Sequence, residues 1–194
     1  MTRWWWVRHG PTHAKGMVGW TDLPADLSDS GTIERLIAAL PEQALVISSD
    51  LRRAVATADL IPGTRLPHEA GLREIGFGDW EQLTADEVSA RHGALARRYW
   101  EQPGDIAPPG GESWNTLCQR VAETVDRLTL LHPGRDIVCV AHFGVILSEL
   151  QRANGQTAVE AFSQPIAPLS LSRVDISAGQ RHCLFANRRF HHDP

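Results

Sequence analysis

Three short segments made up entirely of apolar residues constrain the fold of this chain most strongly. They span residues 4–7, 44–47 and 137–140 and read WWWV, ALVI and IVCV. A run of four residues is too short for a helix, and a strand that is apolar on both faces has to be covered on both faces. Helical patterns separate the three segments. The alternation predicts an α/β fold of three layers, with a mainly parallel central sheet and helices on both of its faces.

The helical patterns are read from spacing and from helix-start signals. Apolar residues recur on one helix face between residues 33 and 40 and again between residues 114 and 128. Thr84 and Glu87 form a capping box that starts a helix reaching residues 99–100. Further helices are expected at residues 52–60 and 144–152, and two further strands at residues 169–176 and 182–186. We expect one domain over residues 1–194, with a small helical and loop cap around residues 80–112.

Cationic residues, histidine and glycine follow the three apolar segments. Arg8 and His9 follow the first, Arg53 comes shortly after the second, and His142 and Gly144 follow the third. The carboxyl ends of parallel strands meet at one edge of a sheet, so these groups should converge there. Cations that repel one another are held together by an anion, and the planar fork of arginine matches phosphate oxygens. The sequence therefore predicts a phosphate site at this edge.

The histidines also allow covalent chemistry at such a site. A neutral imidazole attacks phosphorus to form a phosphohistidine, and nearby guanidinium groups keep the imidazole neutral. The leaving oxygen then needs a proton. Glu74, in the glycine-flanked segment 71–81, is the candidate acid, because a carboxyl group facing bound phosphate has a raised pKa. Thr12 and Ser48 are candidate hydroxyl ligands of the phosphate.

Taken together, these segments resemble the histidine phosphatase superfamily, which also contains the cofactor-dependent phosphoglycerate mutases. Residues 8–12 read RHGPT and resemble its signature, and residues 48–58, SSDLRRAVATA, match its second segment at every specified place. Glu74 stands in a Leu-x-Glu segment that precedes a Gly-x-Trp-Glu stretch, and His142 precedes a glycine turn. The resemblance implies a phosphoglycerate mutase-like fold and an enzyme.

The resemblance also implies roles for individual residues. His9 would be the nucleophile, and Arg8 and His142 would complete the phosphate pocket. Arg53 would be the second arginine of that pocket, in place of its neighbour Arg52. Hydrolysis in this family needs no metal and no organic cofactor, so we expect neither here.

Two positions depart from the family's pattern, and one loop borders the expected pocket. Lys15 stands where many members have asparagine, which adds a cation at the edge of the pocket. Phe143 stands where glycine is usual, so it would narrow the pocket or press on the substrate. Trp20 follows the Arg-His-Gly turn and is a candidate for the substrate mouth, with simple turn packing as an equal alternative. Gly144 would let the backbone approach the phosphate.

Three functions are compared on this basis. The favoured function is a phosphomonoesterase that acts on a small phosphorylated metabolite. Residues 108–113, PPGGES, resemble the compact phosphatase branch, which includes α-ribazole phosphatases, so α-ribazole phosphate is one candidate substrate. A phosphoglycerate mutase is the first alternative, although mutases generally carry extra segments over the site. A non-catalytic phosphate-binding module is the second, although binding alone needs neither His9 nor Glu74.

Composition bears on partners more than on chemistry. The formal net charge is −4, which provides no general attraction to nucleic acid or to anionic membranes. Three widely spaced cysteines indicate reduced thiols, and we expect a cytoplasmic protein. A metal site that uses His9 and His13 at helical spacing is disfavoured, because Gly10 and Pro11 interrupt any helix there. The oligomeric state is not indicated.

Overall fold

The three apolar segments form the centre of a six-stranded sheet. The computed structural model describes residues 1–190 of the chain. Its strands are β1 (Thr2–Arg8), β2 (Leu45–Ser48), β3 (Thr64–Arg65), β4 (Asp136–Ala141), β5 (Leu171–Ser177) and β6 (Gln180–Arg188). They are ordered β3-β2-β4-β1-β5-β6 across the sheet.

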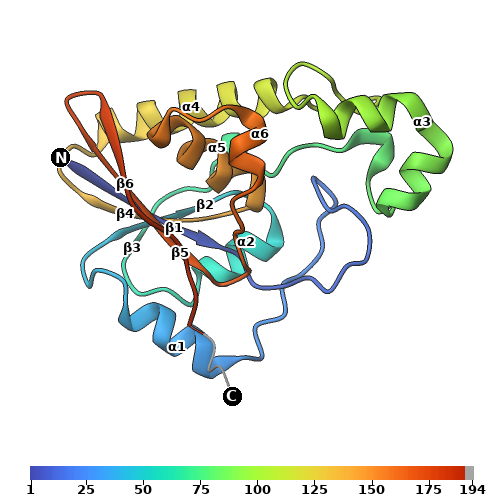
Figure 1. The fold of residues 1–194 in the computed structure, drawn as a ribbon. Coiled ribbons are helices and arrows are strands. Elements are labelled where there is room, and N and C mark those ends of the chain that lie inside the picture. Colours follow the sequence, from blue (N-terminus) through green and yellow to red (C-terminus); the bar gives the residue numbers. More distant parts are fainter. Residues whose placement is uncertain (191–194) are drawn as a thin grey trace.

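The sheet is mainly parallel, as predicted. β1 and β2 both run parallel to β4, and β3 runs parallel to β2. The last two strands form a hairpin, in which β5 is antiparallel to both β1 and β6. The hairpin lies beside β1 and leaves the parallel block β3-β2-β4-β1 intact (Figure 1). The predicted α/β architecture is therefore confirmed, with an antiparallel addition at one side.

Helices cover both faces of the sheet. They are α1 (Ser30–Ala38), α2 (Arg52–Ala58), α3 (Ala85–Glu101), α4 (Trp114–Leu131), α5 (Phe143–Asn154) and α6 (Ala158–Phe162). Apolar residues of α4 and α5 pack on one face, whereas those of α1 and α2 pack on the other. Figure 1 shows this division, with α4 and α5 above the sheet and α1 below it.

The tryptophans of β1 follow the two-residue period of a strand. Trp4 and Trp6 point to the α4 and α5 face, where both are fully buried and their rings stack with centroids 5.1 Å apart. Trp5 points to the other face, where the Arg173 guanidinium lies 4.5 Å from its ring centroid. Bulky side chains on both faces hold β1 rigidly between the helix layers. The strand is therefore a firm support for the residues that follow it.

Helix α3 lies beyond the carboxyl ends of the parallel strands and has its own small core (Figure 1). The capping box of Thr84 and Glu87 forms as predicted. Trp80 and Tyr99 are buried together in a cluster that also contains Val88. At Gly93 the backbone takes φ 31° and ψ −99°, which kinks the helix in a conformation that glycine tolerates. The kink bends the end of α3 toward the start of α4 (Figure 1).

Four short elements were not predicted. Strand β3 has two residues and α6 has five, and the 3₁₀ helices η1 (Ala70–Leu72) and η2 (Gly78–Trp80) have three each, so none is long enough to show a periodicity. The three cysteines are free thiols, Cys139 being fully buried. Within residues 1–190, no helix is both long enough and apolar enough to cross a membrane.

Candidate active site

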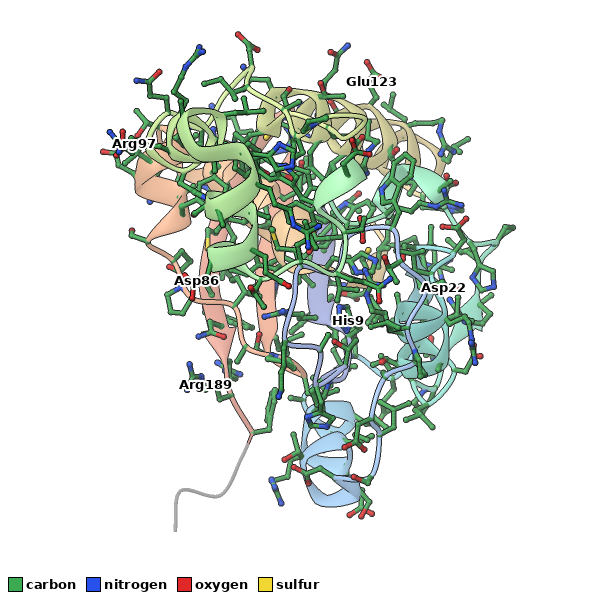
Figure 2. The ribbon with its side chains drawn as sticks, turned by 90° about the vertical axis from the view of Figure 1, so that its right-hand side faces the viewer. His9, Asp22, Asp86, Arg97, Glu123 and Arg189 are labelled. Atoms are coloured by element: carbon green, nitrogen blue, oxygen red, sulfur yellow. The ribbon has the colours of Figure 1, made fainter. Side chains whose placement is uncertain are left out.

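The carboxyl ends of β1, β2 and β4 lie level with one another at one edge of the sheet. Arg8 at the end of β1 pairs with Ala141 of β4, and Ser48 of β2 pairs with Val140. The pairing with β4 continues one residue beyond β1 and beyond β2. The His9 amide donates to the Ala141 carbonyl over 3.1 Å, and the Ser49 amide donates to the Val140 carbonyl over 3.3 Å. Figure 2 looks toward this edge, with His9 near its centre. The predicted convergence of the three strand ends therefore occurs.

His9 is buried, with an exposed fraction of 6%. Its Nδ1 lies 2.6 Å from the carbonyl oxygen of Gly10. Because a carbonyl oxygen can only accept, Nδ1 carries the proton and Nε2 carries the lone pair. Burial and the charges of Arg53 and Arg8 lower the pKa of His9 to about 3, although the bond to Gly10 opposes the shift. The imidazole is therefore neutral at pH 7.

Arg53 is buried beside His9 and is held by a loop. Its Nε donates to His9 Nε2 over 3.2 Å. Its Nη1 donates to the Thr21 carbonyl over 2.9 Å, and its Nη2 donates to the Gly19 carbonyl over 2.6 Å. The neighbouring Arg52 is exposed. The first turn of α2 thus directs one arginine inward, where two loop carbonyls orient its guanidinium.

His142 is fully buried, and its ring centroid lies 5.0 Å from that of His9. Its Nε2 lies 2.6 Å from the Ser49 hydroxyl. Its Nδ1 is buried without a hydrogen-bond partner among the described residues. Burial, together with the neighbouring His9 and the nearby arginines, lowers the pKa of His142 well below its usual value. Ser49 is thus the hydroxyl that contacts His142.

Ser48, expected to be a hydroxyl ligand of the phosphate, faces other residues than Ser49 does. Its hydroxyl lies 3.3 Å from His68 Nδ1 and accepts a hydrogen bond from Arg65 over 3.1 Å. Successive residues of an extended chain point to opposite faces, so only one of two adjacent serines can face the histidines. The dipeptide alone did not indicate which one.

Arg8 borders the same space from the end of β1. Its Nη1 donates to the Ile166 carbonyl over 2.5 Å. Its Nε is buried and has no hydrogen-bond partner within residues 1–190. The guanidinium carbon lies 5.6 Å from the ring centroid of Phe143, which places the aromatic residue at the arginine as a cation–π neighbour.

Glu74 is a buried carboxyl group, with an exposed fraction of 7%. Burial raises its pKa, while hydrogen bonds from Ile75 and Gly144 and the charges of Arg8 and Arg53 oppose the rise. The Gly144 amide donates to Glu74 Oε1 over 3.0 Å. A Cβ at position 144 would lie 2.5 Å from that oxygen, so glycine is required for this contact. Gly144 therefore positions the acid by its backbone.

Two residues that the sequence did not single out support Glu74. Arg120 of α4 donates from Nη2 to the Glu74 carbonyl over 3.0 Å and from Nη1 to the Arg73 carbonyl over 2.8 Å. Glu112 accepts from Arg120 Nη2 over 2.7 Å and from the Gly76 amide over 2.9 Å. In the sequence, Arg120 cannot be told from the solvent-exposed charged residues of a long amphipathic helix. The sequence therefore gave no signal that it supports Glu74.

Glu81 organises the loop that holds Arg53. Its carboxylate accepts hydrogen bonds from the backbone amides of Gly19, Trp20 and Thr21 and from the Thr21 hydroxyl, over 2.6–3.2 Å. It also accepts from the Phe77 amide over 3.1 Å. The loop carbonyls fixed in this way are those that orient Arg53. Both carboxylate oxygens of Glu81 are therefore occupied by the loop.

The residues expected at the substrate mouth differ in their surroundings. The Trp20 indole donates to the Glu74 carbonyl over 2.8 Å, and 46% of its side chain is exposed. Lys15 is exposed and makes no ion pair within the described part of the chain, and the Thr12 hydroxyl makes no hydrogen bond there. His13 does not join His9, since its imidazole lies 2.7 Å from Asp26.

Comparison with known proteins agrees with this geometry. The model of the histidine phosphatase superfamily (branch 1) matches residues 4–189. The chain belongs to the histidine phosphatase superfamily. The resemblance predicted from the sequence is thus confirmed, and the protein is an enzyme, a histidine phosphatase. A purely non-catalytic module does not fit this assignment.

Relatives within the superfamily include phosphatases and a mutase. A glucosyl-3-phosphoglycerate phosphatase of Mycolicibacterium vanbaalenii is 34% identical over 155 residues, covering 72% of this chain and 68% of the relative. A 2,3-bisphosphoglycerate-dependent phosphoglycerate mutase of Cytophaga hutchinsonii is 28% identical over 187 residues, covering 89% of this chain and 82% of the relative. The crystal structure of the α-ribazole phosphatase from Shigella flexneri superposes with a TM-score of 0.79 at 26% identity, covering 96% of each chain.

Proposed function

We propose that this histidine phosphatase hydrolyses small phosphate monoesters through a phosphohistidine formed on His9. The observation that supports this most directly is a pair of buried nitrogens beside His9, Arg8 Nε and His142 Nδ1, which have no partner among the described residues. An unsatisfied buried N–H group is costly, and phosphate oxygens are strong acceptors. A phosphoryl group bound against His9 would satisfy both nitrogens.

Arg53 would contribute to the same phosphate-binding site. Three of the five N–H groups of a guanidinium are used by His9, Gly19 and Thr21, which leaves two for phosphate oxygens. The loop carbonyls fix the plane of the guanidinium before substrate arrives. Such preorganised positive charge stabilises the equatorial oxygens of the transferring phosphoryl group, because it needs no rearrangement during the reaction.

The first half-reaction follows from the tautomer of His9. Nε2 carries the lone pair, which accepts from Arg53 Nε before substrate binds; that hydrogen bond is given up as Nε2 attacks phosphorus, while the bond from phosphorus to the ester oxygen breaks. Glu74, whose buried carboxyl group has a raised pKa, gives its proton to that leaving oxygen. The products of this step are the free alcohol, phosphorylated His9 and the Glu74 carboxylate.

The second half-reaction uses the same groups in reverse. Water attacks phosphorus, the Glu74 carboxylate takes a proton from it, and the bond between phosphorus and Nε2 breaks. Inorganic phosphate leaves, and neutral His9 and protonated Glu74 are restored. Charges on Arg8 and Arg53 would favour both steps, because negative charge develops on the phosphoryl oxygens each time.

A trapping experiment tests this proposal. Rapid quenching of wild-type protein with phosphorus-labelled p-nitrophenyl phosphate should give a phosphoenzyme that is stable in base and labile in acid, as expected for phosphohistidine. His9→Ala should give none, whereas His13→Ala, a histidine in the same segment that pairs with Asp26, should give the wild-type amount. A phosphoenzyme that persists in His9→Ala would overturn the assignment.

The natural substrate is proposed as a class of compound, a small phosphorylated metabolite. A small phosphorylated metabolite fits the buried site, and α-ribazole phosphate is a candidate because the Shigella flexneri protein of that name shares the fold over nearly the whole chain. Comparing kcat/KM for α-ribazole phosphate with that for other phosphate monoesters tests this. A kcat/KM no higher than that of simple alkyl phosphates would rule α-ribazole phosphate out as the preferred substrate.

Mutase activity is the second candidate, and the Cytophaga hutchinsonii relative supports it. A mutase returns the phosphoryl group from histidine to a second hydroxyl, whereas a phosphatase loses it to water. Incubation with 3-phosphoglycerate in the presence of 2,3-bisphosphoglycerate separates the two. Formation of 2-phosphoglycerate faster than inorganic phosphate would favour the mutase.

A further inference from the structure

The hydroxyl of Ser49 makes two contacts just beyond the end of β2. Ser49 is fully buried, and its Oγ lies 2.6 Å from His142 Nε2. The same oxygen accepts a hydrogen bond from the Leu51 amide over 3.4 Å. Within residues 1–190, no other group hydrogen-bonds to this hydroxyl. Together, the two contacts determine where the protons of Ser49 and His142 lie.

The contact with Leu51 fixes the direction of the Ser49 hydroxyl hydrogen. An amide N–H can only donate, so Oγ accepts from Leu51 through a lone pair. The hydroxyl hydrogen then has one acceptor within reach among the described residues, which is His142 Nε2. If Nε2 carried a proton, Ser49 would accept from both sides and its own hydrogen would be buried without an acceptor, which is costly. Ser49 therefore donates to His142.

His142 consequently carries its ring proton on the other nitrogen. Burial, the neighbouring His9 and the nearby arginines lower the pKa of His142, so the imidazole is neutral and holds one proton. With Nε2 as an acceptor, this proton lies on Nδ1. That nitrogen is buried and has no hydrogen-bond partner in the described part of the chain. The ring thus presents an unpaired N–H donor, directed away from Ser49 because the two ring nitrogens point to different sides.

His9 has the same tautomer, but it is held by the opposite end of its ring. Its Nδ1–H donates to the Gly10 carbonyl over 2.6 Å, which leaves the lone pair on Nε2. The ring centroids of His9 and His142 are 5.0 Å apart, so the two imidazoles border one space. A nitrogen with a lone pair can attack phosphorus, whereas an N–H group can only donate to a phosphoryl oxygen. The anchoring of each ring therefore separates a nucleophile from a donor.

We propose that Ser49 is a positioning residue, which fixes His142 as a hydrogen-bond donor to the phosphoryl group while His9 acts as the nucleophile. This role rests on the proposed phosphatase function. Ser49 acts through His142, because its Oγ contacts Nε2 and not the nitrogen that donates. A donor that is oriented before substrate arrives stabilises the charge on the phosphoryl oxygens without rearrangement during the reaction.

The position of the ring proton can be measured in the wild-type protein without any turnover. Long-range proton–nitrogen NMR correlations of protein that contains isotope-labelled histidine distinguish a protonated ring nitrogen from a bare one. The signals of His142 are identified by their absence from His142→Ala. At neutral pH we expect the proton on Nδ1. A proton on Nε2 in the wild type would overturn the proposal and leave the phosphatase function intact.

Ser49→Ala removes the group that fixes the proton. The ratio of the two tautomers of His142 should shift toward Nε2–H by about two- to tenfold, the range for one neutral hydrogen bond. The kcat/KM for p-nitrophenyl phosphate should fall by about the same factor, since only the Nδ1–H form donates to the phosphoryl group. An unchanged tautomer ratio, or an unchanged kcat/KM, would overturn the proposal.

Ser148→Ala is the matched control for the loss of a buried hydroxyl. Ser148 is also buried, but its hydroxyl donates to the Val145 carbonyl over 2.8 Å. Both the tautomer ratio of His142 and kcat/KM should therefore keep their wild-type values in this variant.

A double-mutant cycle separates positioning from a structural role. In the His142→Ala background there is no ring for Ser49 to orient, so adding Ser49→Ala should lower kcat/KM no further. A loss of the same size in both backgrounds would show that Ser49 acts on the fold and would overturn the proposal. Absence of turnover of every ester by the wild type, p-nitrophenyl phosphate included, would instead refute the proposed function.

Discussion

Glu81→Gln should destabilise the loop that orients Arg53 and should lower activity with it. Glu81 accepts five hydrogen bonds, of which Oε1 takes those from Trp20 and Phe77 and Oε2 takes the other three. Glutamine keeps only one acceptor oxygen, so in either orientation at least two donors face an NH₂ group. Each donor left unsatisfied costs about 1–3 kcal/mol. Because the site is half-buried, we expect a total loss of about 2–4 kcal/mol in the free energy of unfolding.

The pH dependence has a definite sign. Burial alone would raise the pKa of Glu81, but the hydrogen bonds from Thr21, Trp20 and Phe77 outweigh it and lower the pKa. A carboxylate with a lowered folded-state pKa stabilises the fold above its unfolded value, near 4.3, and this contribution disappears as the pH falls through the folded-state pKa. The difference between wild type and Glu81→Gln should therefore be constant from neutral pH to about pH 5 and shrink below about pH 4.

Equilibrium unfolding in urea and by heat, together with kcat/KM for p-nitrophenyl phosphate, measures both effects. The melting temperature should fall by about 5–15 °C. A displaced Arg53 should lower kcat/KM by roughly a hundredfold, as for a misplaced catalytic group. Asp79→Asn is the matched control, since Asp79 is exposed in the same segment and loses the same charge. Wild-type stability in Glu81→Gln, or a loss equal to that in Asp79→Asn, would refute the reasoning.

Three further predictions concern the reaction. Arg53→Ala should raise KM and lower kcat, with a combined loss of several kcal/mol in transition-state stabilisation. Replacing the exposed neighbour, Arg52→Ala, should change kcat/KM little, and the reverse result would contradict the choice of Arg53 as the phosphate ligand. In single-turnover kinetics, Glu74→Gln should slow phosphoenzyme formation far more from an alkyl phosphate than from p-nitrophenyl phosphate, because only the alkoxide needs the proton; equal losses would show that Glu74 is not the acid. EDTA-treated protein should keep full activity, because arginine supplies the positive charge; a loss restored by one specific metal would contradict this.

Burial limits the positive charge of the catalytic cluster, because it lowers the pKa values of both histidines. Arg8, Arg53, His9 and His142 would repel one another if all were charged. Burial and the two arginines keep both imidazoles neutral, and Glu74 lies within reach of both arginines. The remaining positive charge is directed at one space, which a phosphate dianion would occupy.

The main helices and strands of this protein could be predicted from the sequence, because the spacing of apolar residues in each one shows which of its faces are buried. The apolar runs of β1, β2 and β4 indicated strands covered on both faces, and the one-face spacing in α1 and α4 indicated amphipathic helices. The capping box at Thr84 located the start of α3 to the residue. Because polar residues followed each buried strand, the rule for parallel sheets brought Arg8, His9 and His142 together before the strand order was known.

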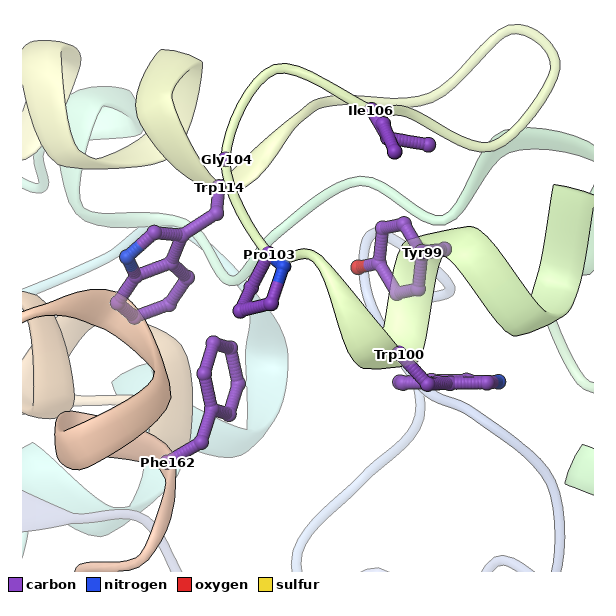
Figure 3. Close-up of a pocket in the computed structure, with 7 residues that line it drawn as sticks. All are labelled: Tyr99, Trp100, Pro103, Gly104, Ile106, Trp114 and Phe162. Carbon is purple, nitrogen blue, oxygen red and sulfur yellow. The ribbon is translucent and has the colours of Figure 1, made fainter.

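Only the tertiary structure decided which residues support those groups. Ser49 contacts His142 and Ser48 does not, Glu81 holds the loop around Arg53, and Tyr99 and Phe162 share a small pocket although they lie far apart in the sequence (Figure 3). These contacts join segments that lie far apart in the sequence, and no periodic spacing of residues indicates that such segments meet. Periodicity reports how one element meets the core, whereas the neighbours of a loop carboxylate or a cap aromatic depend on how all the elements pack together.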